Sequence, residues 1–297
     1  MRLIVTGTQG QVARSLIERV GVAGVELVAV GRPELDLADP ASVASAFANA
    51  RADVVVNAAA YTAVDKAESE EELATAINGV GAGLVAEAAR RIGAPIIHLS
   101  TDYVFDGSLD RPYREDDPPA PIGAYGRSKL AGERAVAAAH PHHTILRTAW
   151  VYSPFGANFV KTMLRLGETR PQINVVADQR GSPTSALDIA DAILAVAAKL
   201  SSAPDKRGLV GTFHMTGTGE ASWAEFARAV FSEAELHGRL PGAVVDILTE
   251  QYPTPARRPK NSRLNGARLR EVYGAVLPDW RASLKSCVGR LLAAPTT

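Results

Sequence analysis

The 297-residue chain contains 32 Lys and Arg residues and 32 Asp and Glu residues, and 46% of its residues are apolar. This balance is typical of a globular protein and indicates neither a nucleic-acid partner nor a membrane-surface partner. The one cysteine, Cys287, cannot form an intramolecular disulfide, and the apolar run before Thr6 is too short for a signal peptide. We therefore expect a cytoplasmic protein that does not span a membrane.

Short apolar runs alternate with helical segments through the first half of the chain. The apolar runs are residues 2–7, 24–31, 52–60, 94–101 and 143–152, and helices are expected near 11–20, 40–49, 70–91 and 124–139. Apolar strands separated by helices are typical of a parallel sheet that is buried on both faces and joined by right-handed crossovers. The predicted fold class is α/β, with a Rossmann-type doubly wound parallel sheet.

The composition changes after Trp150, where Pro, Gly and polar residues become frequent. A helix is expected over 186–200, a strand over 211–217 that rejoins the first sheet, and a helix over 222–236 with Ser222 as its N-cap. The prolines in 252–264 exclude a regular helix there. We expect a larger domain of residues 1–150 plus about 184–216, and a smaller, discontinuous domain of about 151–183 plus 217–297.

A glycine-containing turn links the first strand to the first helix. The segment VTGTQGQVA places Gly7 and Gly10 in this turn, and Ala13 occupies a third small position. Glycines here let the backbone approach a pyrophosphate, and the helix N-terminus offers free N–H groups. Because ordinary turns also use glycine, a purely structural turn is the alternative. We expect the larger domain to bind a dinucleotide through Gly7, Gln9, Gly10, Gln11 and Val12.

The end of the second strand bears on the choice between the two nicotinamide cofactors. An acidic residue at this position binds the ribose diol, whereas an arginine accommodates a 2′-phosphate. The residue here is Arg32, so NADPH is expected, with NADH as the second option. We expect Asp36 and Leu37 to lie on the adenine side. The alternative for Arg32 is a solvated loop cation.

Three side chains could together transfer a proton to a carbonyl oxygen. Thr101 ends the strand 94–101, and Tyr125 precedes Lys129 by one helical turn. An ammonium and a cationic nicotinamide would both lower the pKa of a phenol from its usual value of about 10. Thr101 would hold the carbonyl oxygen while Tyr125 donates the proton and hydride reaches the carbon. An amphipathic surface pair is the alternative for Tyr125 and Lys129.

The motifs TGTQGQVA, NAAAYTAVDKAE, STDYVFDG and AYGRSKLAGE occur in an order that resembles the extended short-chain dehydrogenase/reductase superfamily. With DQRGSPTSALDIAD and PTPARRPKNSRL, the chain resembles the dTDP-4-dehydrorhamnose reductase family over essentially its full length. The resemblance implies NAD(P)H-dependent reduction of a dTDP-linked 4-keto-6-deoxy sugar, dTDP-4-dehydro-L-rhamnose, to dTDP-L-rhamnose. The smaller domain would then bind the sugar nucleotide.

The resemblance also implies roles for individual residues. Thr101, Tyr125 and Lys129 would be catalytic, and Tyr125 and Lys129 would also contact the cofactor. Further cofactor contacts would come from Ala58, Ala59, Ala60, Tyr61 and Asn78, and Asn78 would support the lysine through water. Substrate-binding residues would be Val64, Thr101, Asp102, Tyr103, Phe105, Tyr125, Trp150 and Arg257, with Asp65 in the same segment as Val64.

Departures from the family pattern bear on metal binding and assembly. Thr101 replaces a common serine and keeps the hydroxyl, and Ala13 replaces the usual third glycine. Some members dimerise through a metal held by acidic side chains, and Ser15 and Leu187 stand at those places here. We therefore predict no metal, and a monomer or a weak homodimer.

Each of two clusters of basic residues has two interpretations. His140, His142 and His143 are expected to form an exposed turn, because no cysteine is near enough to suggest a zinc site. For Arg257, Arg258 and Lys260 a pyrophosphate clamp and a solvated basic loop remain equal alternatives.

Three further residues are assigned to the interior. Trp223 and Phe226 have the spacing of core residues on one helix face. Arg147 lies inside an apolar strand and requires a buried partner, which the sequence does not identify.

Two rival functions remain. One is a sugar-nucleotide epimerase or dehydratase with a permanently bound nicotinamide. Dehydratases usually have two acidic residues directly after the strand-end hydroxyl, whereas only Asp102 follows Thr101 here, which disfavours dehydration. The other is a regulatory subunit like the non-catalytic partner of an S-adenosylmethionine-forming enzyme. The intact set of Thr101, Tyr125 and Lys129 favours catalysis.

Overall fold

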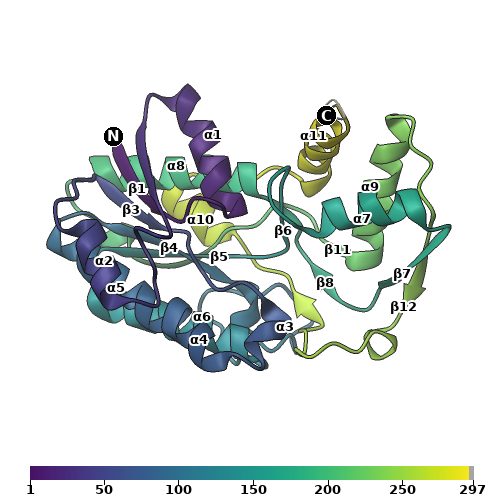
Figure 1. The fold of residues 1–297 in the computed structure, drawn as a ribbon, viewed down its shortest axis with the longest axis horizontal. Helices are drawn as coiled ribbons and strands as arrows, with labels where there is room; N and C mark the ends of the chain where they lie inside the picture. Colours follow the sequence, from purple (N-terminus) through teal and green to yellow (C-terminus); the bar gives the residue numbers. More distant parts are fainter. Residues whose placement is uncertain (294–297) are drawn as a thin grey trace.

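A six-stranded parallel sheet forms the centre of the larger lobe. The structure, a computed structural model, describes residues 1–293 (Figure 1). The strand order is β10-β5-β4-β3-β1-β2, and every neighbouring pair is parallel. The strands are β1 (Arg2–Thr6), β2 (Glu26–Val30), β3 (Val54–Asn57), β4 (Ile96–Thr101), β5 (His143–Thr148) and β10 (Gly211–His214). This arrangement confirms the predicted fold class and the return of the strand near 211–217 to the first sheet.

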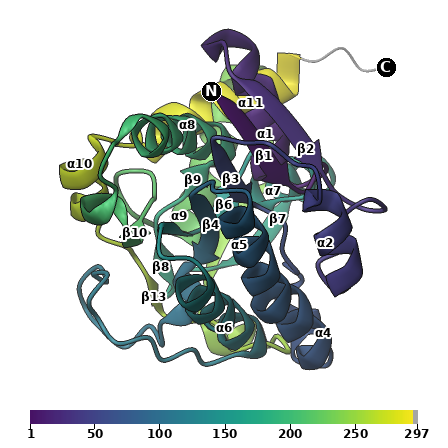
Figure 2. The same cartoon turned by 90° about the vertical axis from the view of Figure 1, so that its left-hand side faces the viewer.

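Helices cover both faces of this sheet (Figures 1 and 2). One face packs against α1 (Gln11–Ala23), α8 (Ala186–Ser202) and α10 (Ala267–Tyr273), where side chains such as Leu3, Val5 and Ile193 are fully buried. The other face packs against α2 (Pro40–Phe47), α5 (Ala82–Arg91) and α6 (Ala124–Ala139). Burial on both faces explains why the strands are nearly continuous apolar runs.

The predicted helix 70–91 is interrupted in the structure. It consists of α4 (Glu71–Thr75), a π-helical turn η1 (Ala76–Gly81) and α5. Such π turns often occur at functional sites. A short helix, α3 (Val64–Ala67), precedes this region, and the single turn η2 (Asp102–Val104) follows β4.

The predicted strand 143–152 also ends early. Trp150 has a positive φ of 48°, which separates β5 from β6 (Val151–Tyr152). A non-glycine residue rarely adopts this conformation. The break turns the chain out of the main sheet, and β6 pairs instead with β9 (Thr184–Ser185).

The smaller lobe contains α7 (Phe159–Thr169), β7 (Gln172–Val176), α9 (Trp223–Leu236), β12 (Ala243–Ile247) and α11 (Trp280–Ala293). Strands β7 and β12 pair in parallel, and this lobe has its own apolar core around Phe226 and Trp280. Ser222 caps α9 as predicted, since its hydroxyl accepts from the N–H of Glu225 at 3.1 Å. The proposed domain boundaries remain predictions.

Short elements connect the two lobes. The strands β8 (Arg180–Gly181), β11 (Ala221–Ser222) and β13 (Asn261–Ser262) form a three-stranded sheet. Single helical turns occur at η3 (Arg207–Leu209) and η4 (Thr249–Gln251). Within residues 1–293, the longest apolar helical stretches fall short of what crossing a membrane requires.

Arg147, on β5, finds its partner on α6. Its guanidinium donates to both carboxylate oxygens of Glu133, at 2.8 and 2.7 Å, and the side chains are 4% and 6% exposed. The hydroxyl of Ser100 donates to the same carboxylate at 2.6 Å. This buried ion pair joins α6 to the sheet directly below the carboxyl ends of β4 and β5.

Replacing Arg147 with methionine should destabilise the protein by about 3–5 kcal/mol, because it leaves the Glu133 carboxylate buried without its cation. The free energy of unfolding measured with urea tests this. Arg207→Met is a matched control, since Arg207 and Asp205 form a pair whose side chains are 89% and 57% exposed, and it should cost less than about 1 kcal/mol. Equal losses in the two variants would show that the buried pair is not important for stability.

Candidate active site

The turn after β1 has the geometry of an anion-binding loop. Gly7 has a φ of 92°, and its N–H donates to the carbonyl of Val30 at 2.7 Å. Gly10 is the N-cap of α1, and no side chain caps this helix end. A Cβ at Gly10 would have no heavy atom within 4 Å, so the space in front of the helix is open. Open space and free N–H groups at a helix N-terminus fit a pyrophosphate.

Gln11 joins this turn to the connection between the lobes. Its Oε1 accepts from the hydroxyl of Ser153 at 2.8 Å and from the amide of Asn158 at 3.1 Å. Its Nε2 donates to the carbonyl of Val151 at 3.4 Å. The side chain of Gln11 is therefore engaged within the protein, which leaves its backbone, with those of Gln9 and Val12, for a ligand.

Arg32 lies at the edge of the same turn. It is exposed and follows Gly31, where a Cβ would come within 3.0 Å of the Thr8 hydroxyl. Asp36 accepts from the N–H of Ala38 at 2.9 Å. The side chain of Leu37 is only 5% exposed and packs in the core, so only its backbone can face an adenine ring.

Residues 58–61 lie against the other side of the turn. The N–H groups of Ala58 and Ala59 both donate to the hydroxyl of Thr6 at 3.1 Å. Ala59 also comes within 3.5 Å of the Cβ position of Gly7. Together with Ala60, which is partly exposed, this segment forms a wall beside the anion-binding turn.

Asn78, in the π-helical turn, fixes the end of this wall. Its Oδ1 accepts from the N–H of Tyr61 at 2.8 Å, and its Nδ2 donates to the carbonyl of Tyr61 at 3.0 Å and to the hydroxyl of Ser128 at 2.9 Å. The expected support of Lys129 by Asn78 through water stays a prediction. Asn78 is hydrogen-bonded directly to the backbone of Tyr61 and to the side chain of Ser128 on α6.

Thr101, Tyr125 and Lys129 meet at the carboxyl end of β4. The ammonium of Lys129, 2% exposed, donates to the carbonyl of Leu99 at 2.7 Å. Tyr125 is half-buried, and its ring contacts Tyr103 edge to face at a centroid distance of 5.6 Å. Thr101 accepts from the N–H of Tyr103 at 3.2 Å and donates to Asp102 at 3.0 Å.

The pKa of Tyr125 in the ligand-free protein is raised, whereas a lowered pKa was expected. Burial and the charge of Asp102 raise the pKa of Tyr125 to about 12, while a hydrogen bond from Thr101 opposes the rise. Burial lowers the pKa of Lys129 to about 8, and the nearby Glu133 opposes that change. The protein alone therefore keeps the phenol protonated at neutral pH, and the lowering expected from Lys129 together with a bound nicotinamide stays a prediction.

Two expected substrate contacts differ in exposure. Phe105 is 1% exposed and stacks on Tyr113 at 4.1 Å, so the structure places it in the core. Trp150 is half-buried and stacks on Trp223 with a centroid distance of 3.5 Å. Phe226 is fully buried as predicted, but Trp223 is only partly buried and lines a cavity, which corrects its assignment to the core.

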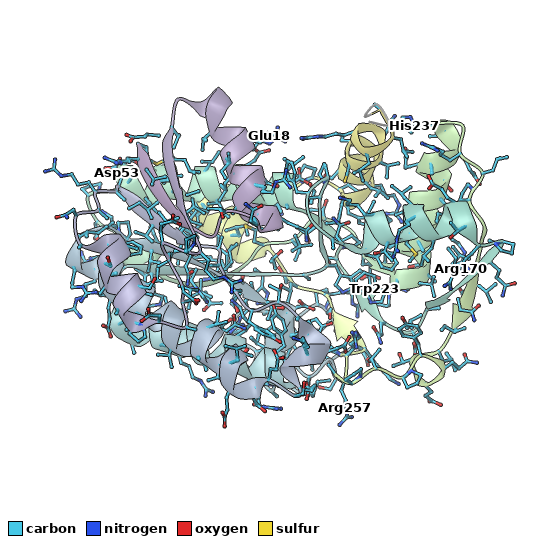
Figure 3. The ribbon with its side chains drawn as sticks, in the orientation of Figure 1. Glu18, Asp53, Arg170, Trp223, His237 and Arg257 are labelled. Carbon is cyan, nitrogen blue, oxygen red and sulfur yellow. The ribbon has the colours of Figure 1, made fainter. Side chains whose placement is uncertain are left out.

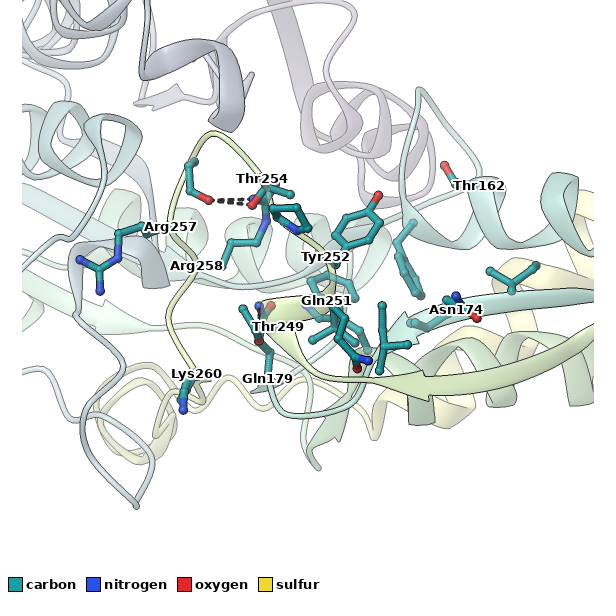
Figure 4. Close-up of a pocket in the computed structure, with 18 of the residues that line it drawn as sticks. Thr162, Asn174, Gln179, Thr249, Gln251, Tyr252, Thr254, Arg257, Arg258 and Lys260 are labelled. Atoms are coloured by element: carbon teal, nitrogen blue, oxygen red, sulfur yellow. Dashed lines mark hydrogen bonds between the residues drawn. The ribbon is translucent and has the colours of Figure 1, made fainter.

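Asp65, next to Val64 on α3, binds the segment 254–258 of the smaller lobe. Its carboxylate accepts from both terminal nitrogens of Arg258, at 3.1 and 2.8 Å, and from the N–H of Ala256 at 3.2 Å. This ion pair holds the pKa of Asp65 below its usual value. Arg258 is thus bound within the protein, whereas Arg257 and Lys260 are exposed (Figures 3 and 4).

A cavity of about 1110 Å³ lies beside this ion pair (Figure 4). Its walls come from α7, β7, α9, β12, the loop 106–108 and the segment 249–260, and they include Thr162, Asn174, Gln179, Trp223 and Tyr252. Of the residues predicted to bind substrate, only Arg257 lines it. The alternation of polar and apolar residues over 172–175 was the available signal for β7.

The histidine turn and the expected metal positions contain no ligand cluster. His140 is buried, contrary to the expected exposed turn, and its Nε2 lies 2.9 Å from the carbonyl of Ala94. Ser15 donates to the carbonyl of Gln11 at 2.8 Å, and Leu187 is partly buried in the first turn of α8. Over residues 1–293, no group of three or more His, Cys, Asp or Glu side chains is placed to bind a metal ion.

The chain matches a family model and similar proteins over nearly its full length. The model for the RmlD substrate binding domain matches residues 1–293. The chain is 53% identical over 295 residues to a dTDP-4-dehydrorhamnose reductase of Sinorhizobium fredii, covering 98% of each sequence.

Solved structures give the same result. The crystal structure of a dTDP-4-dehydrorhamnose reductase from Clostridium acetobutylicum has a TM-score of 0.91 and 39% identity, covering 98% of this chain and 99% of that one. A dTDP-4-dehydrorhamnose reductase from Bacillus anthracis in complex with NADP has a TM-score of 0.89 and 38% identity, covering 96% and 98%. The chain therefore belongs to the RmlD substrate binding domain family, together with these dTDP-4-dehydrorhamnose reductases.

Proposed function

We propose that the protein reduces the 4-keto group of dTDP-4-dehydro-L-rhamnose to give dTDP-L-rhamnose, with NADPH as the preferred donor and NADH as an alternative. The observation that carries this proposal is the meeting of Thr101, Tyr125 and the buried Lys129 at the carboxyl end of the central strand β4. Ligands of open α/β sheets bind at this edge. Full-length relatives that are named for this reaction support the substrate assignment.

The chain supplies the binding groups for the cofactor and the proton for the reaction. The anion-binding turn at Gly7 and Gly10 would hold the pyrophosphate, and Arg32 would bind the 2′-phosphate. The nicotinamide, when bound, supplies the hydride. Tyr125 then donates its proton to the oxygen that becomes the hydroxyl group.

The pKa values of the ligand-free protein suit this direction of reaction. A phenol with a pKa of about 12 is protonated at neutral pH and ready to act as an acid. Lys129, with a pKa of about 8, is charged at neutral pH and stabilises the phenolate left by the transfer. Thr101 orients the carbonyl oxygen from the strand end.

The sugar and the nucleotide would occupy different parts of the cleft. Tyr103, whose ring contacts Tyr125 edge to face, would lie at the sugar end, and Val64 and Trp150 would contribute further contacts there. The cavity beyond the Trp150–Trp223 stack has room for the nucleotide, and Arg257 and Lys260 at its edge offer cations for the diphosphate. The single, buried Cys287 suits a reducing compartment, and we place the reaction in the cytoplasm.

Tyr125→Phe should retain NADPH binding but lose at least about 100-fold in kcat, because it removes the proton donor while keeping the ring. Fluorescence titration measures the Kd for NADPH, and NADPH oxidation measures turnover. Phe155→Leu serves as an aromatic control outside the site, since Phe155 packs against Arg14 and Arg290 on the surface of α1 and α11. A kcat near that of the wild type in Tyr125→Phe would exclude Tyr125 as the donor.

A panel of dTDP-, UDP- and GDP-linked 4-keto-6-deoxy sugars tests the substrate. NADPH oxidation should be fastest with dTDP-4-dehydro-L-rhamnose, and the product should be dTDP-L-rhamnose. Stoichiometric NAD⁺ in the purified protein would favour the epimerase or dehydratase alternative. A co-purifying partner without turnover of any sugar would favour the regulatory-subunit alternative.

Arg32→Ala should raise the KM for NADPH at least about tenfold and leave the KM for NADH nearly unchanged, because only NADPH carries the 2′-phosphate. Initial rates with each cofactor at saturating sugar nucleotide measure both constants. Arg51→Ala, an exposed arginine that precedes β3, is the control and should alter neither. Equal changes for both cofactors in Arg32→Ala would contradict a phosphate contact.

A further inference from the structure

We propose that Asp102 supplies protons to Tyr125 through the hydroxyl of Thr101. A buried carboxyl group would thus reprotonate the proton donor after each turnover. The inference rests on the proposed function and adds a residue to it. Asp102 acts through Thr101, and is therefore a positioning and proton-supplying residue.

The hydrogen bonds of Thr101 give the first argument. Its Oγ1 accepts from the N–H of Tyr103 at 3.2 Å and lies 3.0 Å from Oδ1 of Asp102. A hydroxyl has one proton to donate. While Asp102 is ionised, the Thr101 proton is committed to the carboxylate and cannot serve Tyr125 or the ketone.

Protonation of Asp102 reverses this hydrogen bond. The carboxyl O–H then donates to Oγ1 of Thr101, which still has a second lone pair beside the one used by Tyr103. Thr101 is then free to donate to the ketone oxygen and, once Tyr125 has given up its proton, to the phenolate oxygen of Tyr125. It already lies close enough to that phenol for a hydrogen bond to lower the pKa of Tyr125. The two protonation states of Asp102 thus select which neighbour Thr101 serves.

The surroundings of Asp102 favour the protonated form. The residue is 3% exposed, and its Oδ2 has no hydrogen-bond partner among residues 1–293. An unpartnered buried oxygen costs less on a neutral acid than on a carboxylate. Consistently, burial raises the pKa of Asp102 to about 6, against opposing hydrogen bonds. A sugar nucleotide that excludes water from the cleft would raise the pKa further.

The other polar groups around Asp102 come from three elements. Tyr103 follows it in η2, Tyr125 faces it from α6, and the hydroxyl of Ser262 faces it from β13 and lowers its pKa. The charged pair Arg258 and Asp65 acts on Tyr103. Asp102 has a pKa near neutral pH and can therefore store and release the proton, whereas Lys129, with a pKa of about 8, donates to the Leu99 carbonyl.

The transfer balances without any further reactant. Tyr125 gives its O–H proton to the oxygen of the reduced ketone, and the phenolate then takes the proton of Thr101. The Thr101 oxygen takes the proton of Asp102, whose O–H bond breaks and leaves a carboxylate. Asp102 regains a proton from solvent once the product leaves.

The pH dependence of Asp102→Asn tests the relay. The amide retains an acceptor for Thr101 but has no acidic proton to pass on. The ratio of kcat in the wild type to kcat in the variant should be at least about tenfold larger at pH 5.5, where Asp102 is protonated, than at pH 8.5, where it is ionised. Asp188→Asn is the control, because Asp188 is also a carboxyl with a raised pKa bonded to a hydroxyl, that of Ser283, but lies on α8. Its ratio to the wild type should not change with pH.

Substitutions of Thr101 provide a second test of the relay. Thr101→Val should abolish the pH-dependent component, and Thr101→Ser should retain it, because serine restores the hydroxyl. A kcat ratio for Asp102→Asn that is the same at every pH would indicate a purely structural role and overturn the relay. Failure of the wild type to reduce any 4-keto sugar would instead contradict the proposed function.

An infrared titration of the ligand-free protein tests the carboxyl group without turnover. The wild type should show a protonated-carboxyl C=O band that disappears as the pH rises through about 6, and Asp102→Asn should lack this band while Asp188→Asn retains it. Absence of a band specific to Asp102 down to pH 5 would overturn the proposal, even if the variant did not fold well enough for kinetics.

Discussion

Close packing of α6 against two backbone segments is the constraint on which the site depends. A Cβ at Gly132 would lie 2.0 Å from the carbonyl oxygen of Asn78, and one at Gly126 would lie 2.2 Å from that of Tyr103. Only glycine permits such an approach, so α6 touches both the π-helical turn and the end of β4 through backbone atoms. This contact sets the height of Tyr125 above the sheet and brings Lys129 within reach of the Leu99 carbonyl.

The polar groups between α6 and the sheet depend on the same close packing of the helix. Glu133 lies one turn after Lys129 and reaches Arg147 on β5 and Ser100 on β4. The ion pair is buried, and removing either member would leave an uncompensated charge. The helix is therefore fixed both by the glycine contacts and by the buried charge pair. A proton donor that must meet a substrate oxygen within a few tenths of an ångström benefits from such support.

Much of the larger lobe could be predicted from the sequence, because buried parallel strands leave continuous apolar runs and the glycine turn has a characteristic spacing. The helix 124–139 was also predictable, and so was the meeting of Thr101 with Tyr125, since both lie at the carboxyl edge of one sheet. The partner of Arg147 was not, because a buried carboxylate in a polar helix resembles a surface one. The cavity was missed because β7 and β12 are short strands that pair across about 70 residues of chain. The raised pKa of Tyr125 depends on burial, which no local pattern reports.

The most direct test compares two glycine-to-alanine substitutions in helices. Gly132→Ala introduces a methyl group where there is no space, whereas Gly21→Ala in α1 introduces one with no neighbour within 4 Å. Both free energies of unfolding and both values of kcat would be measured. We expect Gly132→Ala to lose at least about 2 kcal/mol and most of its turnover, and Gly21→Ala to gain up to about 1 kcal/mol with turnover unchanged. Equal stability and turnover in the two variants would contradict the account, because Tyr125 and Lys129 would then not depend on the close packing of α6.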